Sequence, residues 1–525
     1  MSAAAVTSLG LRPSISNGCT LEQVVEALES KVRCVRPDLL GTRVLGVTLD
    51  SRAVRPGDLY AALPGSRAHG AQFVAAAAAA GAVAVLTDDA GVATTQEAAP
   101  QLAVLVSDDP RAVLGQVAAT VYGDPAVDVT LLGITGTNGK TTTTYLMDAV
   151  LRSAGRVTGL VGTVETRVAD ERVPSVRTTP EAPDLHALLA AMRERGVQVC
   201  SMEVSSQALA QHRVDGAVMD VAGFTNFSQD HLELHGDMGT YLAAKALLLT
   251  PAHSRRAVVV VDDDGSRRAA AGATVPIITL TGQAGSDADW RVVERTPSGA
   301  GTDFVLVGPR GQRLGLRCPL PGDFNVLNAA LAALVLLAAG LTEQQVVDGL
   351  RSADGVPGRM EQVGDPASGP LAVVDYAHTP DAVAAALDAL RPATSGRLVV
   401  VLGAGGDRDP GKRPAMGAAA ADAADVVVVT DDNPRSEDPA AIRSAVLAGA
   451  RRAADVRAGR GERVEVVEIG DRAAAIDEGV RLANRSGDVL LVAGKGHEPG
   501  QEVAGVVHPF DDRAEVARAL REVRP

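Results

Sequence analysis

Apolar residues in this chain fall into short runs that alternate with longer stretches rich in Ala and Leu. A short apolar run is typical of a strand buried on both faces, and the longer stretches are typical of covering helices. The alternation predicts an α/β protein whose sheets are mostly parallel. The longest apolar stretch, residues 326–341, contains Asn328 and Gly340. It falls short of the roughly 18–20 residues of a membrane span, so we expect a core helix there.

At 525 residues the chain is too long for one hydrophobic core, and the runs divide it into three domains. The first, residues 1–126, is a small N-terminal α/β domain. Its strands are expected at residues 44–50, 59–63, 82–87 and 103–107, with a helix at residues 71–81. About the first 20 residues are expected to form a flexible tail.

The second domain, residues 127–355, opens as strand, Gly-rich loop and helix, and is predicted to be a doubly wound sheet. Further strands are expected at residues 197–203, 219–224 and 257–261, a small antiparallel insert at 276–320, and a closing helix at 325–339. The third domain, residues 356–525, is predicted to be a Rossmann-like α/β unit. Its strands are expected at residues 371–377, 397–404, 425–432, 463–469 and 488–494.

Charge and cysteine content exclude several classes of protein. The net charge of −14 argues against a nucleic-acid binder, which needs basic surface to displace counterions. The four cysteines have no CxxC spacing, so neither a disulfide framework nor a zinc site is expected, and a reducing compartment fits. The N-terminus lacks the basic and apolar regions of a signal peptide. We therefore expect a soluble cytoplasmic protein that acts on small molecules. A monomer is expected, although none of these features determines the oligomeric state.

Lysine is rare in this chain. Only Lys31, Lys140, Lys245, Lys412 and Lys495 are present among 50 basic residues. Arginine serves wherever a positive charge suffices, so a lysine that persists is a candidate for chemistry that needs a primary amine.

The loop GTNGKTT, residues 136–142, joins a predicted strand to a predicted helix. Its backbone N–H groups and the helix N-terminus form a cradle for polyphosphate. Lys140 can reach the β- and γ-phosphates, and Thr141 offers a hydroxyl to Mg²⁺. A Gly-rich turn without ligand is the alternative, but the strand–loop–helix context favours an ATP site. The candidate ATP-binding residues of the loop are Gly136, Thr137, Asn138, Gly139, Lys140, Thr141 and Thr142.

Three further residues in the central domain are candidates for catalysis. Glu203 ends a buried strand, where a carboxylate is well placed to bind the metal of a P-loop protein. His231 follows another hydrophobic run, and Lys245 lies in the apolar stretch YLAAKALLL. The alternatives are a structural histidine for His231 and a lysine that snorkels from the edge of the core for Lys245.

In the third domain, polar loops follow several predicted strands. Asp375 ends one strand, where an acidic residue often holds a ribose hydroxyl; a helix cap is the alternative. Residues 403–414, 431–439 and 493–498 leave the ends of other strands, and the first of these concentrates glycine with Arg408, Lys412 and Arg413. Each loop alone is compatible with a simple turn. Together they predict a binding crevice at one sheet edge.

These motifs resemble those of the Mur ligases, and within that family those of the ligases that add 2,6-diaminopimelate. The matching strings include TLDSR, GDLYAAL, GITGTNGKTTT, TTPEAP, MEVSSQAL, FTNFSQDHLELHG, YLAAKALLL, GDFNVLNAALA, GRME, VVDYAHTPDA, GGDRDPGKRP, TDDNPR and AGKGHE. They run in order from residue 48 to residue 498 and so cover nearly the whole chain.

The resemblance implies an ATP- and Mg²⁺-dependent amide-forming ligase of peptidoglycan precursor synthesis. Its substrates would be UDP-N-acetylmuramoyl-L-alanyl-D-glutamate, meso-diaminopimelate and ATP. ATP would phosphorylate the D-Glu carboxylate, and the amine of diaminopimelate would attack the acyl phosphate. Transfer between two anions needs charge neutralisation, which accounts for the P-loop, Lys140 and the metal.

The resemblance also implies roles for individual residues. The UDP-linked dipeptide would be bound by Leu49, Ser51, Ser66, Arg67, Ala68, Thr178, Thr179, Ser205, Gln211 and Arg213. The catalytic residues would be Lys140, Lys245, Glu203 and His231, with Thr141, Glu203, His231 and Lys245 as a carbamate serving as metal ligands. Asn325, Asn328, Arg359 and Asp375 would complete the ATP site. The incoming amino acid would be held by Arg408, Asp432, Asn433, Pro434, Arg435, Gly494 and Glu498.

Two departures from the family pattern flank the dipeptide site, since Arg177 stands where some relatives have Asn and Gln207 where some have His. The alternatives within the family are a lysine-adding ligase at the same step and a folylpolyglutamate-type ligase. A P-loop regulator that ligates nothing is the alternative from another class, but it would need neither Lys245 nor a metal-binding Glu203.

Overall fold

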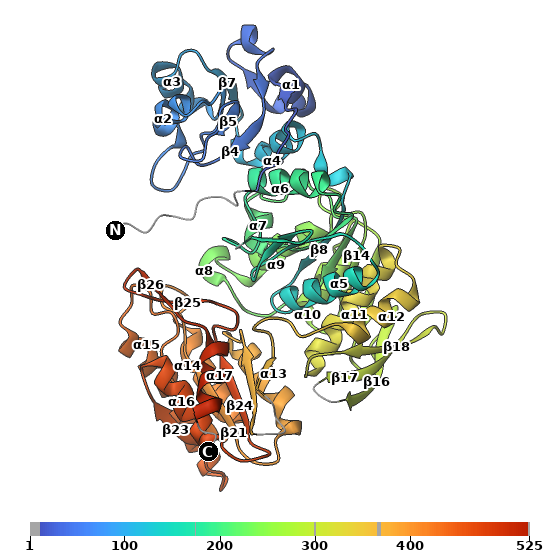
Figure 1. Ribbon diagram of the computed structural model, residues 1–525, viewed down its shortest axis with the longest axis vertical. Coiled ribbons are helices and arrows are strands. Elements are labelled where there is room, and N and C mark those ends of the chain that lie inside the picture. The colour runs from blue at the N-terminus through green and yellow to red at the C-terminus, as the bar shows by residue number, and fades with distance from the viewer. Residues whose placement is uncertain (1–10, 174, 299–300, 365–368, 523–525) are drawn as a thin grey trace.

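The structure is a computed structural model that describes residues 11–173, 175–298, 301–364 and 369–522. Three α/β units follow one another along the long axis, with the N-terminal unit at one end and the C-terminal unit at the other (Figure 1). The predicted three-domain α/β class is confirmed. No helix in the described ranges is both long and apolar enough to cross a lipid bilayer.

The N-terminal unit is a five-stranded sheet in the order β2-β7-β6-β5-β4. The strands are β2 (Arg33–Cys34), β4 (Gly46–Thr48), β5 (Asp58–Ala61), β6 (Ala84–Thr87) and β7 (Ala103–Val106). The helices are α1 (Leu21–Leu28), α2 (Val74–Ala79), α3 (Asp89–Ala98) and α4 (Pro110–Val121), and β1 (Cys19–Thr20) pairs separately with β3 (Arg43–Val44). β4 to β7 are parallel neighbours, which places their carboxyl ends at one edge.

The flexible tail predicted for about the first 20 residues is wrong for its second half, and residues 1–10 lie outside the described ranges. Leu11 is buried, and Arg12 Nη1 donates to both carboxylate oxygens of Asp58 at 2.7 and 2.8 Å. Asp58 opens β5 and is itself buried, so the arginine supplies the counter-charge that a buried carboxylate needs. The sequence shows no local pattern for this pairing because 46 positions separate the two residues.

The central unit is an eleven-stranded sheet in the order β11-β10-β9-β12-β8-β13-β14-β15-β16-β17-β18. Its parallel part contains β8 (Thr130–Thr135), β9 (Thr158–Val161), β12 (Val199–Glu203), β13 (Val221–Phe224), β14 (Ala257–Val260) and β15 (Ile277–Thr281). One edge carries β10 (Thr166–Val168) and β11 (Glu171–Val173), the other β16 (Trp290–Ser298), β17 (Gly301–Val307) and β18 (Arg313–Cys318). The expected antiparallel insert is thus a continuation of the main sheet, because β16 pairs with β15.

Helices cover the central sheet on both faces, as parallel strands require. They are α5 (Lys140–Ser153), α6 (Ala182–Glu194), α7 (Ser206–Ala210), α8 (Leu232–His235), α9 (Met238–Ala246), α10 (Asp264–Ala271), α11 (Asp323–Ala338) and α12 (Glu343–Ser352). The long apolar stretch is α11, which is buried against the sheet as a core helix.

The C-terminal unit is a six-stranded sheet in the order β19-β20-β24-β21-β22-β23. Its strands are β19 (Glu361–Val363), β20 (Leu371–Asp375), β21 (Leu398–Leu402), β22 (Val426–Val429), β23 (Glu465–Glu468) and β24 (Val489–Ala493). Its helices are α13 (Pro380–Leu390), α14 (Lys412–Ala423), α15 (Pro439–Ala458), α16 (Arg472–Leu482) and α17 (Asp512–Glu522), with a hairpin of β25 (Gly500–Val503) and β26 (Val506–Pro509). All strands but the edge strand β19 are parallel, so the loops that follow them gather at one edge.

Candidate active site

One cavity of about 690 Å³ lies where the carboxyl ends of the central strands face those of the C-terminal strands. It is lined by most of the residues predicted from the sequence. From the central unit these are Thr137, Asn138, Gly139, Lys140, Thr141, Thr142, Thr178, Thr179, Glu203, Ser205, Arg213, His231, Lys245, Asn325 and Asn328. Arg359, Asp375, Arg408, Asp432, Asn433, Arg435, Gly494 and Glu498 complete the lining from the C-terminal side.

The Gly-rich loop connects β8 to α5, and its residues from Thr137 onward line the cavity. Lys140 Nζ donates to the carbonyl oxygens of Gly136 and Thr137, both at 2.9 Å. Burial lowers the pKa of Lys140, while the carboxylates of Glu203 and Asp230 act in the opposite direction. The two carbonyl oxygens are neutral acceptors. A bound polyphosphate would offer Lys140 negatively charged oxygens in their place, which form stronger hydrogen bonds with an ammonium group.

The loop is fixed from two sides. Gly139 has φ +85°, and a Cβ there would lie 2.3 Å from Asn328 Oδ1, so only glycine fits. Asn226, which follows β13, accepts from the backbone N–H of Asn138 at 3.0 Å and donates to its carbonyl oxygen at 3.1 Å. The loop therefore keeps the shape of a phosphate cradle through contacts with its neighbours.

Glu203, the last residue of β12, is buried beneath the start of α5. Its carboxylate oxygens lie 3.0 and 3.1 Å from the Thr141 hydroxyl. The backbone N–H of Thr163 donates to the same carboxylate at 2.8 Å. A carboxylate and a hydroxyl side by side form the oxygen-rich pair that Mg²⁺ prefers.

These residues fit a magnesium ion that also binds phosphates and water, but not an all-protein metal site. Across the described ranges, no three His, Cys, Asp or Glu side chains gather closely enough to hold a metal ion. Mg²⁺ is commonly bound by one or two carboxylates together with substrate phosphates. Thr141 and Glu203 supply such a partial set.

Lys245 is 1% exposed, which excludes a snorkelling lysine. Its Nζ donates to Gly136 O at 2.7 Å and lies 4.5 Å from the centre of the Tyr241 ring. Burial and the nearby Lys140 ammonium hold the pKa of Lys245 well below its usual value. A lowered pKa increases the share of the neutral amine, which is the form that reacts with CO₂ to give a carbamate.

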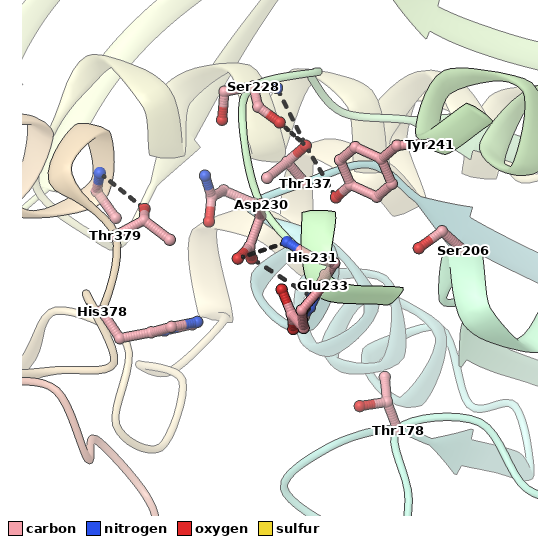
Figure 2. A network of polar contacts seen from close by, with 12 residues as sticks. Thr137, Thr178, Ser206, Ser228, Asp230, His231, Glu233, Tyr241, His378 and Thr379 are labelled. Atoms are coloured by element: carbon pink, nitrogen blue, oxygen red, sulfur yellow. Dashed lines mark hydrogen bonds and ion pairs between the residues drawn. The ribbon is translucent and has the colours of Figure 1, made fainter. Parts of the chain in front are cut away.

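His231 stands at the mouth of the cavity and is not a buried structural histidine, since its side chain is 46% exposed. Its ring lies between two carboxylates, 3.4 Å from Asp230 Oδ2 and 3.7 Å from Glu233 Oε1 (Figure 2). The ring of His378, from the C-terminal unit, points toward Asp230 across the cavity (Figure 2). Burial lowers the pKa of His378 to about 4, so this imidazole is neutral near pH 7.

Arg359 reaches from the segment between α12 and β19 into the phosphate cradle. Its Nη2 donates to the Thr141 hydroxyl at 3.0 Å, and its guanidinium carbon lies 4.3 Å from the centre of the Tyr376 ring. Asp375 accepts the backbone N–H groups of Met360 and Ala377 at 2.7 and 2.8 Å. Asp375 is therefore not a helix cap, because α13 is capped by Thr379.

On the side of the cavity toward the N-terminal unit, Thr178, Thr179, Ser205 and Arg213 form a polar wall. Arg213 Nε lies 3.0 Å from Glu181 Oε1, and the Nη2 of Arg213 donates to Gln211 Oε1 at 2.5 Å. Arg111 of the N-terminal unit contacts the same Glu181 at 3.2 Å, and Arg177 lies 3.8 Å from it. Three guanidinium groups around one carboxylate leave an excess of positive charge that favours an anion.

The other residues predicted for the nucleotide lie outside the cavity lining. Leu49 and Ser51 follow β4, while Ser66, Arg67 and Ala68 follow β5 in a loop closed by a bridge between Pro64 and His69. Both loops leave the carboxyl edge of the N-terminal sheet, so they share one side of that unit.

In the C-terminal unit, Asn433 and Glu498 are held together by a lysine that the sequence reasoning did not select for the site. Asn433 Nδ2 donates to Glu498 Oε2 at 2.8 Å. Lys495, which is fully buried, donates to Asn433 Oδ1 at 2.9 Å and to Glu498 Oε2 at 3.3 Å. The sequence shows that Lys495 belongs to the motif AGKGHE, but its contact with Asn433 arises only in the folded chain.

Arg435 lines the cavity with part of its guanidinium already engaged. Its Nη1 donates to Gly406 O at 2.6 Å, and its Nε lies 3.5 Å from Glu502 Oε2. Arg408 and Lys412 also line this end of the cavity. Pro434 lies outside the lining and precedes a residue in the left-handed region, since Arg435 has φ +54°.

The sequence reasoning also missed Asn226, Asp230, Tyr376 and His378, all of which line the cavity. Tyr376 and His378 lie within three residues of the end of β20, and Asn226 and Asp230 lie within six residues of the end of β13. Their position shortly after a strand end was the available signal.

Three family profiles match successive parts of the chain. The Mur ligase family, catalytic domain, matches residues 43–122; the Mur ligase middle domain matches residues 134–336; the Mur ligase, glutamate ligase domain, matches residues 358–496.

Curated relatives extend over nearly the full length. The UDP-N-acetylmuramoyl-L-alanyl-D-glutamate–2,6-diaminopimelate ligase of Streptomyces avermitilis is 54% identical over 92% of this chain and 93% of the relative. The ligase of the same name from Corynebacterium glutamicum is 50% identical over 91% and 92%. A solved structure of a ligase with that name is 33% identical, with a TM-score of 0.67 over 96% of this chain and 99% of its own.

Proposed function

The chain belongs to the Mur ligase family, and from its site we propose that it adds meso-diaminopimelate to the D-Glu of UDP-N-acetylmuramoyl-L-alanyl-D-glutamate, using ATP. One observation carries the proposal. A single cavity contains the phosphate cradle, the polar wall with Arg213 and the cationic end with Arg408 and Arg435. Such a cavity can bring a nucleoside triphosphate, an acidic acceptor and a zwitterionic amino acid together.

The cradle would hold the triphosphate of ATP through the amides of residues 136–142, with Lys140 on the β- and γ-phosphates. Asn325, Asn328, Arg359 and Asp375 would surround the rest of the nucleotide. Thr141 and Glu203 would hold Mg²⁺, which supplies positive charge to the phosphate oxygens when bound. Lys245, as a carbamate, would add a buried metal ligand, and His231 would add one from the cavity mouth.

The polar wall would place the D-Glu carboxylate toward the γ-phosphate. A carboxylate oxygen forms a bond to phosphorus as the bond to ADP breaks, which gives an acyl phosphate. The neutral amine of diaminopimelate then attacks the acyl carbon, and inorganic phosphate leaves from the tetrahedral intermediate. Lys140 would stabilise the charge that develops on the transferring phosphoryl group.

The amino-acid end of the cavity offers both signs of charge. The carboxylates of Asp432 and Glu498 suit an ammonium group, and Arg408 and Arg435 suit carboxylates. Diaminopimelate differs from lysine by a second carboxylate, so the cationic side favours diaminopimelate. The loops after β4 and β5 would hold the uridine end, with Leu49, Ser51, Ser66, Arg67 and Ala68. We place the reaction in the cytoplasm, where ATP and UDP-linked precursors are available, and expect a monomer to perform it.

The test is phosphate release from ATP in the presence and absence of the UDP-dipeptide and of candidate amino acids, with the product identified by mass. Release that requires both the dipeptide and diaminopimelate, with a product heavier by one diaminopimelate residue, supports the proposal. Equal use of L-lysine would refute the amino-acid specificity. Phosphate release that does not depend on the UDP-dipeptide or on any amino acid would refute the ligase assignment.

A further inference from the structure

Beneath the amino-acid end of the cavity lies an ion pair that no step above uses. Arg472 opens α16 and Asp512 opens α17, and both side chains are 0% exposed. Arg472 Nε donates to Asp512 Oδ1, and Nη2 donates to Oδ2, both at 2.7 Å. The pair is bidentate, the geometry in which a guanidinium and a carboxylate bind most strongly.

The same guanidinium binds the backbone of two loops. Its Nη2 donates to the carbonyl oxygen of Ala493 at 3.0 Å, and its Nη1 donates to that of Asp431 at 3.3 Å. Ala493 is the last residue of β24, and Asp431 lies two residues after the end of β22. The next residues along the chain are Gly494 and Asp432. Arg472 thus joins the two loops at the points where they leave the sheet.

The two loops approach each other closely above the guanidinium. Gly494 has φ +117°, and a Cβ there would lie 2.4 Å from Asp432 Oδ2. The backbone N–H of Gly494 donates to Asp375 O at 3.1 Å, which fixes that loop against β20 as well. A shift of either carbonyl would therefore move the side chains that face the cavity.

Stability alone gives no reason for a charged pair at this place. Removing two charges from water is costly, and a well-packed apolar pair of similar volume is often as stable or more so. An apolar pair, however, donates no hydrogen bond to the two carbonyl oxygens. Lysine carries a point charge and lacks the rigid planar fork that spans a carboxylate and two loops at once.

We propose that Arg472 and Asp512 are positioning residues for the incoming amino acid, holding the loops of Asp432–Asn433 and Gly494–Glu498 in register. Asp512 orients the guanidinium, and the guanidinium fixes the two loop carbonyls. The inference rests on the proposed function, because it takes these loops as the amino-acid site. It assigns specificity to a buried pair that does not touch the substrate.

The test separates positioning from folding through a double variant. Arg472→Met alone leaves the Asp512 carboxylate buried without its partner, which destabilises the unit whatever its role. Arg472→Met/Asp512→Leu removes both charges and restores an apolar core while the loop carbonyls stay without donors. We expect the thermal midpoint of the double variant to be near wild type and its KM for the amino acid to rise by about 10- to 100-fold. The KM values for ATP and for the UDP-dipeptide should stay unchanged.

Arg391→Met provides a control in the same C-terminal unit, since Arg391 follows α13 and pairs with a residue at the far edge of the sheet. Arg391 Nη1 lies 2.9 Å from Asp425 Oδ2, and Asp425 precedes β22 at the opposite, amino edge. This variant should change the thermal midpoint without changing the KM for the amino acid. If the control raises that KM as much as the double variant does, the effect is one of general stability and the proposal is wrong.

A double variant with both wild-type stability and wild-type KM for the amino acid would also overturn the proposal. If the double variant does not fold, Arg472→Lys keeps a charge beside Asp512 and should still raise that KM; an unchanged KM in this variant would refute the idea. The readout is the KM of whichever amino acid the wild type accepts. A wild type that prefers L-lysine would therefore refute the proposed substrate and leave the positioning role intact, whereas a wild type that accepts no amino acid would refute both.

Discussion

Replacing Arg435 with Ala should weaken the binding of diaminopimelate selectively. The guanidinium lines the cavity at its cationic end, where the second carboxylate of diaminopimelate would lie. The backbone of Arg435 is anchored independently of the side chain, because its N–H donates to Glu502 O at 3.0 Å and its carbonyl accepts from Ala504 N at 2.7 Å. Ala tolerates φ +54° about as well as Arg does, so the variant should fold.

The contacts of Arg435 set the size of the effect. Nη1 donates to Gly406 O and Nε lies 3.5 Å from Glu502 Oε2, so part of the guanidinium is already used and we count one hydrogen bond to a substrate carboxylate. One charge-assisted hydrogen bond is worth roughly 1.5–3 kcal/mol. Since 1.4 kcal/mol corresponds to a factor of ten, the KM for diaminopimelate should rise about 10- to 100-fold. If the guanidinium formed two hydrogen bonds with the substrate carboxylate, the expected rise in the KM would be larger.

The assay is phosphate release with ATP and UDP-dipeptide saturating and diaminopimelate varied, followed by the same series with L-lysine. The matched control is Arg397→Ala, because Arg397 Nη2 lies 2.7 Å from Glu465 Oε2 at the amino edge of the same sheet and Arg397 does not line the cavity. The control should leave the KM for diaminopimelate unchanged. The reasoning fails if Arg435→Ala retains the wild-type preference for diaminopimelate over L-lysine, or if the KM for ATP rises in parallel.

Three further predictions concern the phosphate end of the cavity. Lys140→Ala should lower kcat by roughly 10²- to 10³-fold through loss of one transition-state contact, and near-normal turnover would contradict the P-loop assignment. Lys245→Ala should lose most activity and recover part of it with added acetate, because a small carboxylate can replace a carbamate; density for a plain amine in a nucleotide complex would count against the carbamate. Glu203→Gln keeps the size of the side chain, so it should raise the magnesium concentration needed for half-maximal activity without an early thermal transition. An early transition with unchanged metal dependence would make Glu203 a structural residue.

The local sequence was sufficient to predict features that are formed by a single continuous segment of the chain. Most parallel strands of the three sheets coincide with predicted apolar runs, because a strand buried on both faces requires a continuous run of apolar residues. The short strands β2, β9, β10, β11 and β19 were not predicted. The phosphate cradle was likewise readable, since residues 136–142 carry their glycines, lysine and threonines within one turn between strand and helix.

Contacts between distant segments were not readable in this way. The pairing of Arg12 with Asp58 turned an expected tail into a packed segment, and Lys495 took a place under Asn433 that its motif did not indicate. The antiparallel insert joined the central sheet because β15 offers it a free edge, which depends on the order of the strands. Each of these outcomes pairs groups that are far apart in sequence.

The sequence by itself determined the three α/β units, the family and the chemical type of the loops at the strand ends. The tertiary structure decided which of those loops share one cavity and how their charges are balanced. Arg435 illustrates the difference, because its charge was evident from DNPR while its engagement with Gly406 depends on the β21 loop lying beside it. Periodicity and turn chemistry are local properties of a chain, whereas a pKa or a free hydrogen-bond donor depends on what every other segment places around it.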